Sequence, residues 1–189
     1  MNKKDVLKIF ESHGALLTGH FKLSSGLHSE KYLQCALVLQ HPDVAQILSK
    51  GLAGKFSKNK VDVVVGPALG GVTLAYEVAR AIGVRGLFTE RQEGKMVLRR
   101  GFSISKGEKA LVVEDVVTTG GSTKEVLGLI KSLGADVVGV GSVIDRSSEK
   151  IDFGVPFESL AKVSVETFEE KDCPLCKKQV PITKPGSRK

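Results

Sequence analysis

The chain has 189 residues, of which 41% are hydrophobic and 26% are charged. This length and composition suit one globular domain with a sizeable core, and no apolar run approaches the length that crosses a bilayer. The net charge of +7 predicts an anionic partner; with no Trp, two Tyr and no strip of mixed aromatic and basic residues, small polyanionic substrates explain that charge better than nucleic acid does.

The first ten residues predict a short amphipathic helix, because Val6, Leu7, Ile9 and Phe10 recur at helical spacing among charged residues. A signal peptide would need an uninterrupted apolar stretch and a cleavage site, so we expect the protein in the cytosol. Residues 21–39 then indicate a β-rich cap. A helix is expected to begin at Pro42, since proline suits the first turn.

The middle of the chain alternates β-branched runs with helical stretches, which is typical of βαβ units on a parallel sheet. The predicted strands are residues 61–65, 85–89, 110–113 and 136–144, and the predicted helices are residues 72–82 and 123–133. We therefore expect a single α/β domain with a central, mostly parallel twisted sheet flanked by helices. Its parts would be a small N-terminal cap (about 1–40), a core (41–165) and a polar tail (166–189).

Two segments lack a regular period. Residues 92–107 combine glycines with four basic residues, and they predict a long hairpin or a mobile loop. The tail is polar and carries three Pro, so we expect it to be extended.

The most informative segment is LVVEDVVTTGGST, residues 111–123. A buried strand brings Glu114 and Asp115 to its carboxyl end, where open α/β sheets bind ligands. The small residues that follow, ahead of a helix, are Thr118, Thr119, Gly120, Gly121 and Ser122. Their glycines, amides and hydroxyls could wrap a phosphate at the helix N-terminus. A ribose 5-phosphate fits both parts, with its phosphate in the loop and its hydroxyls on the acids.

This segment resembles the phosphoribosyl-pyrophosphate motif of the type I phosphoribosyltransferases, in which a hydrophobic run and an acid pair precede Thr-Thr-Gly-Gly-Ser/Thr. A Thr-Gly-Gly-Ser loop alone would fit an ordinary helix start equally well. The resemblance implies that Glu114 and Asp115 hold the ribose 2- and 3-hydroxyls and that residues 118–122 hold the 5-phosphate. It also implies Mg²⁺, held mainly by substrate and water.

Other segments resemble the orotate phosphoribosyltransferase family in particular, and together they cover nearly the whole chain. Residues 19–29, GHFKLSSGLHS, followed by Tyr32, are similar to that family's cap over the base. Residues 65–71, VGPALGG, resemble its pyrophosphate loop, and Arg146 matches the arginine that pairs with the orotate carboxylate. The implied substrate-binding residues are Ser24, Ser25, Gly26, Tyr32, Pro67, Ala68, Leu69, Gly70, Gly71 and Arg146. Considered alone, Arg146 is better explained as a surface charge paired with Asp145.

Residues 90–101 fit that family's mobile catalytic loop. Their cations would neutralise charge on departing pyrophosphate, and they are Arg91, Lys95, Arg99 and Arg100. In the family this loop closes over the neighbouring subunit's site, so the resemblance implies a homodimer. A solvated basic hairpin is the alternative.

The chain departs from the family pattern at four points. Ser24 and Gly70 stand where many members carry lysine, Val97 stands near the position of a histidine, and the acid pair is Glu-Asp rather than Asp-Asp. These departures leave the reaction class intact and leave open which cations serve pyrophosphate, with Arg91 and Lys95 favoured by position.

Two alternative functions remain open. A purine phosphoribosyltransferase would share residues 111–123 but should lack the cap motif and Arg146. A regulator that senses phosphoribosyl pyrophosphate on the same fold would suit the basic surface. The acid pair, the pyrophosphate loop and the cationic loop favour an enzyme.

The last motif is Cys173-Pro-Leu-Cys176, which could be half of a zinc site with four ligands. No second pair exists, Cys35 is remote in sequence and the histidines lie far upstream. A turn with free thiols is therefore favoured, and a site shared between two subunits is the alternative.

Overall fold

In the computed structural model, which describes residues 1–23 and 25–185, a six-stranded sheet forms the centre of the chain. Its strands are β3 (Val63–Pro67), β4 (Arg85–Gln92), β5 (Lys95–Val97), β6 (Lys109–Val117), β7 (Asp136–Asp145) and β8 (Phe157–Lys162). They lie in the order β5-β4-β3-β6-β7-β8, and all neighbours are parallel except β4 and β5. The predicted mostly parallel α/β sheet is confirmed.

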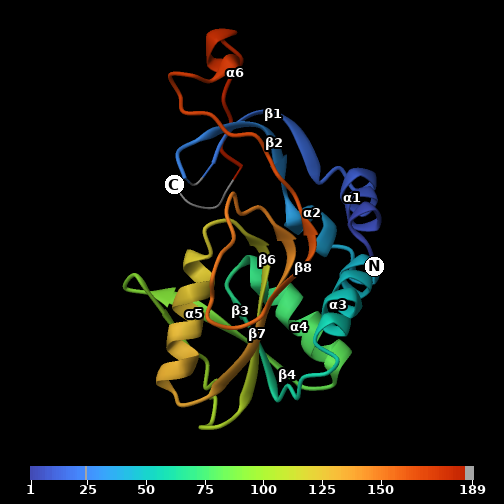
Figure 1. Cartoon of the computed structure of the whole chain (residues 1–189), viewed down its shortest axis with the longest axis vertical. Helices are drawn as coiled ribbons and strands as arrows, with labels where there is room; N and C mark the ends of the chain where they lie inside the picture. Colours follow the sequence, from blue (N-terminus) through green and yellow to red (C-terminus); the bar gives the residue numbers. More distant parts are fainter. Residues whose placement is uncertain (24, 186–189) are drawn as a thin grey trace.

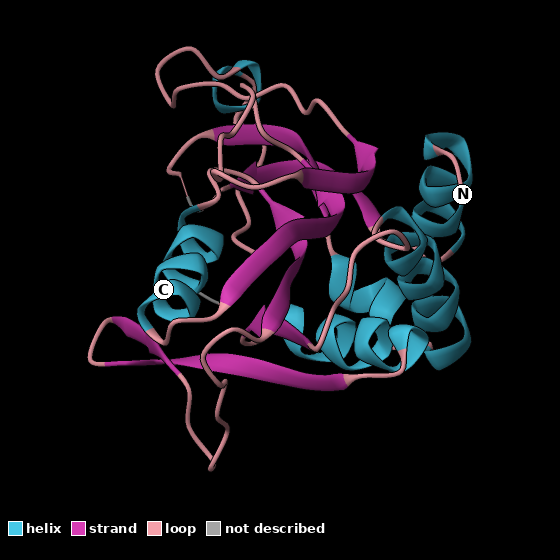
Figure 2. Ribbon diagram, turned by 60° about the horizontal axis from the view of Figure 1, so that its bottom comes forward, coloured by secondary structure: helices cyan, strands magenta, loops and turns pink. Residues whose placement is uncertain are grey.

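Helices cover both faces of this sheet. They are α1 (Lys3–Ser12), α2 (Cys35–Leu39), α3 (Pro42–Lys55), α4 (Gly70–Ile82) and α5 (Gly121–Ser132). The short helix α6 (Pro174–Lys177) lies apart from the sheet (Figure 1). In Figure 1, α1 to α4 gather on one side and α5 covers the other. Figure 2 shows the same layers, with the strands passing between the helices. Of the described helices, none is both long and apolar enough to cross a membrane.

Two hydrophobic cores follow from the alternation of side chains along the central strands. Val64 and Leu111 point into the core shared with α1 to α4. Val65 and Val112, one residue further along each strand, point into the core shared with α5, which contributes Ile130. The central strands are therefore apolar on both faces, which explains their continuous β-branched runs.

A two-stranded hairpin of β1 (Leu16–Lys22) and β2 (His28–Leu33) stands beyond the sheet, and the C-terminal tail folds back onto it. One side of the tail pairs with β2, where the His28 amide donates to the Phe168 carbonyl at 2.8 Å. The other side reaches β1, where the Thr183 amide donates to the His20 carbonyl at 2.8 Å. Figure 1 shows the tail and α6 beyond β1 and β2. From here on, "the cap" means residues 16–23 and 25–33 together with residues 166–185, in place of the wider N-terminal cap that the sequence predicted.

The structure differs from the predicted elements at several places. Residues 35–39 form the helix α2 and not a strand, because a short apolar run fits either conformation. Residues 166–185 are not simply extended, since they contain α6, and residues 186–189 of the predicted tail lie outside the described residues. Strand β8 was not predicted. Residues 92–107 do begin with a hairpin, the β4–β5 turn.

Candidate active site

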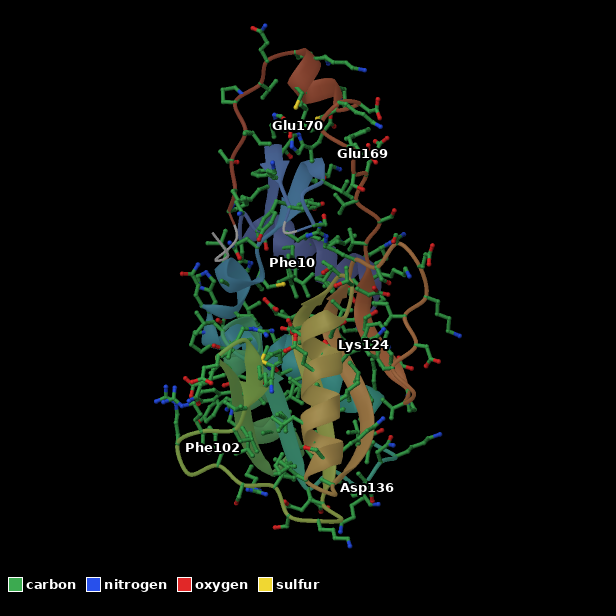
Figure 3. The ribbon with its side chains drawn as sticks, turned by 90° about the vertical axis from the view of Figure 1, so that its left-hand side faces the viewer. Phe10, Phe102, Lys124, Asp136, Glu169 and Glu170 are labelled. Carbon is green, nitrogen blue, oxygen red and sulfur yellow. The ribbon has the colours of Figure 1, made fainter. Side chains whose placement is uncertain are left out.

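Many of the predicted site residues lie where the parallel strands of the sheet end. We call this side of the sheet the carboxyl edge. Because β3, β6 and β7 are parallel neighbours, their carboxyl ends lie side by side: residues 67–71 and Arg146 lie at or just after the ends of β3 and β7, and the acid pair lies within the last four residues of β6. The Arg146 amide donates to the Val117 carbonyl at 2.8 Å, which joins the ends of β7 and β6. In Figure 3 the labelled Lys124, near the start of α5, lies nearer the cap than Asp136, at the start of β7. The carboxyl edge therefore faces the cap.

Asp115 of the acid pair lies directly against Gly70, where the loop that follows β3 enters α4. Glu114 is buried and Asp115 is half-buried, and Asp115 Oδ1 accepts a hydrogen bond from the Val116 amide at 2.9 Å. A Cβ atom placed on Gly70 would lie 2.6 Å from Asp115 Oδ1 and 2.7 Å from Oδ2. Position 70 thus accepts only glycine while Asp115 keeps this orientation, and the loop backbone and the carboxylate form one surface.

The phosphate cradle predicted at residues 118–122 is a sharp turn into α5. Strand β6 ends at Val117, and α5 begins after Gly120, whose φ is +74°. A Cβ at Gly120 would also meet the Phe153 ring at 2.8 Å, so both the backbone conformation and the space require glycine. Because Gly120 offers no side-chain oxygen to cap the helix, the first turn resembles helix N-termini that bind anions.

Arg146 and Tyr32 lie within electrostatic reach of each other on the cap side of the carboxyl edge. Burial lowers the pKa of the Arg146 guanidinium, and its Nε has no hydrogen-bond partner within the described residues. The pKa of Tyr32 is raised, first by burial, then by Asp115 and Cys35, against the opposing effect of Arg146. These four groups therefore lie within electrostatic reach of one another.

A surface pairing of Arg146 with Asp145 does not form. Asp145 is buried and accepts hydrogen bonds from the Ser147 amide at 2.8 Å and the Ser147 hydroxyl at 2.6 Å. Its other oxygen lies 3.4 Å from Lys162 Nζ. Within residues 1–23 and 25–185, Arg146 forms no ion pair, so its charge is available to an anionic ligand.

The four predicted loop cations lie on or just beyond the β4–β5 hairpin and have different surroundings. Arg91 forms a bidentate ion pair with Glu125 of α5, with both N···O distances 2.9 Å. Arg100 pairs with Glu90 at 2.8 Å and lies over the Phe88 ring. Lys95 and Arg99 are exposed, without an ion pair in the described part of the chain. On the cap, Ser25 and Gly26 are exposed, whereas Ser24 lies outside the described residues.

Sequence reasoning missed two features. Cys35, at the start of α2, lies beneath the acid pair, and its thiol is 3.8 Å from the Asp115 carbonyl oxygen. Burial raises the pKa of this thiol well above its usual value, with further contributions from Asp115 and Glu114. The second feature is in the cap, where the histidines expected to be too far away lie beside Cys173 and Cys176. No short-range signal links residues so distant in the sequence.

The comparisons with known proteins agree with this geometry. Residues 36–153 match the family model of the phosphoribosyl transferase domain, a stretch that holds the acid pair, the cradle and the loop after β3. The fold and site thus define a phosphoribosyltransferase. The chain is 60% identical over 189 residues to the orotate phosphoribosyltransferase of Caldanaerobacter subterraneus subsp. tengcongensis and 57% identical to that of Thermoanaerobacter sp., covering 100% of both chains each time. The crystal structure of orotate phosphoribosyltransferase from Aeropyrum pernix aligns with a TM-score of 0.71 and 26% identity, covering 84% of this chain and 93% of that chain. The chain belongs to the orotate phosphoribosyltransferase family.

Proposed function

We propose that the carboxyl edge of the sheet transfers the 5-phosphoribosyl group from phosphoribosyl pyrophosphate to orotate, forming orotidine 5'-monophosphate and pyrophosphate for pyrimidine biosynthesis. The observation that carries this proposal is the arrangement around Asp115. Its carboxylate lies against Gly70 and precedes the helix-start cradle by three residues along the chain, and the unpaired Arg146 lies within electrostatic reach of Tyr32 of the cap.

The direct test is the loss of orotate absorbance with purified protein, phosphoribosyl pyrophosphate and Mg²⁺, run beside a panel of purine bases. Turnover of orotate alone supports the proposal. Consumption of adenine or another purine in place of orotate would show that orotate is not the substrate, but it would still support phosphoribosyl transfer as the reaction. Binding of phosphoribosyl pyrophosphate with no turnover of any base would point to a regulator.

Each part of the edge has a proposed role toward the activated sugar. Glu114 and Asp115 accept hydrogen bonds from the ribose 2- and 3-hydroxyls, and the amides and hydroxyls of residues 118–122 bind the 5-phosphate. Backbone amides of residues 67–71 bind the pyrophosphate, where close approach suits the glycines. The substrate would lie along the edge, with its anomeric carbon between the acid pair and the cap.

The base would bind on the cap side. The Arg146 fork can donate two parallel hydrogen bonds to the orotate carboxylate, a planar acid that matches its geometry. Tyr32 keeps its proton at neutral pH, as tyrosine ordinarily does, and burial raises its pKa further, so its hydroxyl can donate to the base. Ser25 and Gly26, between β1 and β2, complete the cover over the base, whereas Ser24, the third predicted residue, lies outside the described residues.

The chemical step is displacement at the anomeric carbon with inversion. The bond from the orotate nitrogen to this carbon forms as the bond to the pyrophosphate oxygen breaks, through an oxocarbenium-like sugar, and the proton of that nitrogen is released to solvent or to the departing pyrophosphate. No covalent nucleophile is needed, so the protein contributes positioning and electrostatic stabilisation. The acid pair holds the ring, and the loop cations neutralise the charge that develops on pyrophosphate.

Mg²⁺ is the proposed cofactor, and the residues at the edge suit it. Both oxygens of Asp115 face the loop proposed to hold pyrophosphate, and carboxylate and phosphate oxygens are the ligands that Mg²⁺ prefers. When bound, Mg²⁺ would neutralise pyrophosphate and strengthen it as a leaving group. We expect turnover to vanish on chelation and to return with added Mg²⁺. A rate unchanged by chelation would contradict this role.

We further propose a cytosolic homodimer in which the loop of one subunit serves the site of the other. Mixing Asp115→Asn chains with Lys95→Ala chains should then restore activity, since each mixed dimer holds one site with both groups intact. Random mixing predicts about a quarter of wild-type activity. If each loop served its own subunit, the mixture would be no more active than the separate variants.

A glycine substitution tests the contact between the loop and the acid pair. We expect Gly70→Ala to lower kcat/KM by about tenfold or more, because the new Cβ pushes the Asp115 carboxylate from its position. Thermal unfolding and circular dichroism should show an intact fold. Gly128→Ala on α5 is the matched control, since a Cβ there meets no atom within 4 Å. Equal activity of the two variants would show that Asp115 tolerates displacement.

A further inference from the structure

Four side chains of the cap converge on one point. His20 and His28 come from the two strands of the hairpin, and Cys173 and Cys176 come from the turn at α6. One ligand atom from each, a ring nitrogen or a sulfur, lies within 4.8 Å of the other three. His20, His28 and Cys173 are buried and Cys176 is half-buried. Figure 3 shows sulfur beneath α6, close to the labelled Glu170. We call these four residues the cap cluster.

The distances within the cap cluster are those of ligands around one small cation. His20 Nε2 lies 3.0 Å from His28 Nδ1, 3.6 Å from Cys173 Sγ and 3.7 Å from Cys176 Sγ. Cys176 Sγ lies 3.2 Å from His28 Nδ1. Zinc bond lengths of about 2.3 Å to sulfur and about 2.0 Å to nitrogen put tetrahedral ligand atoms about 3.3–3.8 Å apart. These four separations differ from the tetrahedral values by a few tenths of an ångström, and all six lie within 4.8 Å.

Without a metal ion, the hydrogen-bond donors and acceptors of the cap cluster do not match one another. His20 Nδ1 lies 2.7 Å from the Val180 carbonyl oxygen, so this nitrogen carries the proton and Nε2 has a lone pair. If His28 Nδ1 carries a proton, that proton occupies the single lone pair of His20, and the two thiols at 3.6 and 3.7 Å have no ring nitrogen within the cluster left to donate to. If His28 Nδ1 is deprotonated, two lone pairs face each other at 3.0 Å.

A cation removes this conflict, because four lone pairs then converge on one acceptor. The Val180 carbonyl fixes the ring of His20 in the tautomer that leaves Nε2 free to bind, which is a common outer contact of histidine ligands. Two thiolates also balance the charge of a divalent ion, which makes the buried group neutral. A donor set of two sulfurs and two imidazole nitrogens in tetrahedral arrangement selects zinc among the common divalent metals.

We propose that His20, His28, Cys173 and Cys176 of a single chain bind one structural zinc ion. The ion would tie the β1–β2 hairpin to the C-terminal tail. It would also fix both ends of the connection between β1 and β2, because His20 lies on β1 and His28 begins β2. Zinc would thus hold the cover of the base site in place without touching substrate. All four ligands belong to the protein, so the site is closed to catalysis.

The test begins with the metal content of protein purified without chelator. We expect about one zinc per chain by elemental analysis, falling by tenfold or more in Cys176→Ser and in His20→Ala. Cys35→Ala and His13→Ala are matched controls that should keep their zinc, since Cys35 lies beneath the acid pair and His13 packs on His41. Chelation should lower the melting temperature of the wild type by about 5 °C or more and leave that of Cys176→Ser unchanged.

Cobalt substitution keeps the proposal testable even if the variants unfold. Apoprotein titrated with Co²⁺ should show the intense d–d bands of tetrahedral geometry and thiolate-to-cobalt charge transfer, saturating at one equivalent per chain. Folded wild-type protein that binds neither Zn²⁺ nor Co²⁺ would overturn the site. A Cys173–Cys176 disulfide found by mass spectrometry in freshly purified protein would overturn it too, in favour of a redox pair. These readouts do not depend on phosphoribosyl transfer, so failure of one proposal is distinguishable from failure of the other.

Discussion

Asp115→Asn is expected to lower kcat/KM by about 100-fold or more, equivalent to roughly 3 kcal/mol of transition-state stabilisation. The amide keeps the shape of the side chain but removes its charge and replaces one acceptor oxygen with a donor. Asp115 already accepts the Val116 amide through Oδ1, so the second oxygen is the one left for a ribose hydroxyl. The negative charge also stabilises the sugar as it becomes oxocarbenium-like. Steady-state rates with both substrates varied measure the loss.

A matched control is Asp136→Asn, at the opposite end of the sheet. Asp136 begins β7 and pairs with Lys109 Nζ at 2.6 Å on the surface, far from the carboxyl edge. We expect its activity to equal that of the wild type. A similar loss of activity in both variants would mean that Asp115→Asn acts by disturbing the fold. Full activity of Asp115→Asn would show that the Asp115 carboxylate is not needed for the reaction.

Arg146→Ala is expected to raise the KM for orotate by about 100-fold, close to 3 kcal/mol, with little change in the KM for phosphoribosyl pyrophosphate. The guanidinium has no carboxylate partner within the described chain, and an orotate carboxylate would supply one. Removing the side chain therefore leaves the substrate anion desolvated and unpaired. Arg146→Lys keeps a charge but loses the fork, so we expect an intermediate KM.

The split between the two KM values is the informative measurement. Arg80→Ala serves as the control, because Arg80 is an exposed residue of α4 that pairs with Glu77 of the same helix. A rise in the KM for phosphoribosyl pyrophosphate in place of orotate would assign Arg146 to the phosphates. Unchanged constants for both substrates would show that another group receives the carboxylate.

The sequence predicted best those parts of the molecule whose pattern is local. The end of β6, the cradle and the start of α5 follow one another within residues 111–123, so strand pattern, acid pair and turn glycines can be read together. The alternating helices and strands of the core were predicted for the same reason. Strand β8 was missed because it lies at the edge of the sheet and only partly follows the alternation of a half-buried strand.

Contacts between distant residues could not be predicted. The cap cluster joins His20 to Cys173 across 153 positions, and the ion pair of Arg91 with Glu125 depends on how the β4–β5 hairpin lies beside α5. The sequence contains four His and three Cys, but it does not show that the tail returns to the hairpin. Nor could it show that Asp145 would turn to Ser147 and Lys162 and leave Arg146 unpaired.

Because the tail pairs with β1 and β2, the core and the cap reach their final structures in a fixed order during translation. The sheet and the helices α1 to α5 can pack as soon as β8 has left the ribosome, because the buried residues of both cores lie between Val6 and Ala161. The hairpin, although made first, lacks its outer partners at Phe168 and Thr183 until translation is nearly finished. The cap, which we propose to cover the base, is therefore the last region to reach its final structure. A chain that ends before Phe168 would carry a folded sheet beneath a hairpin with both edges exposed, ready to pair with another incomplete chain.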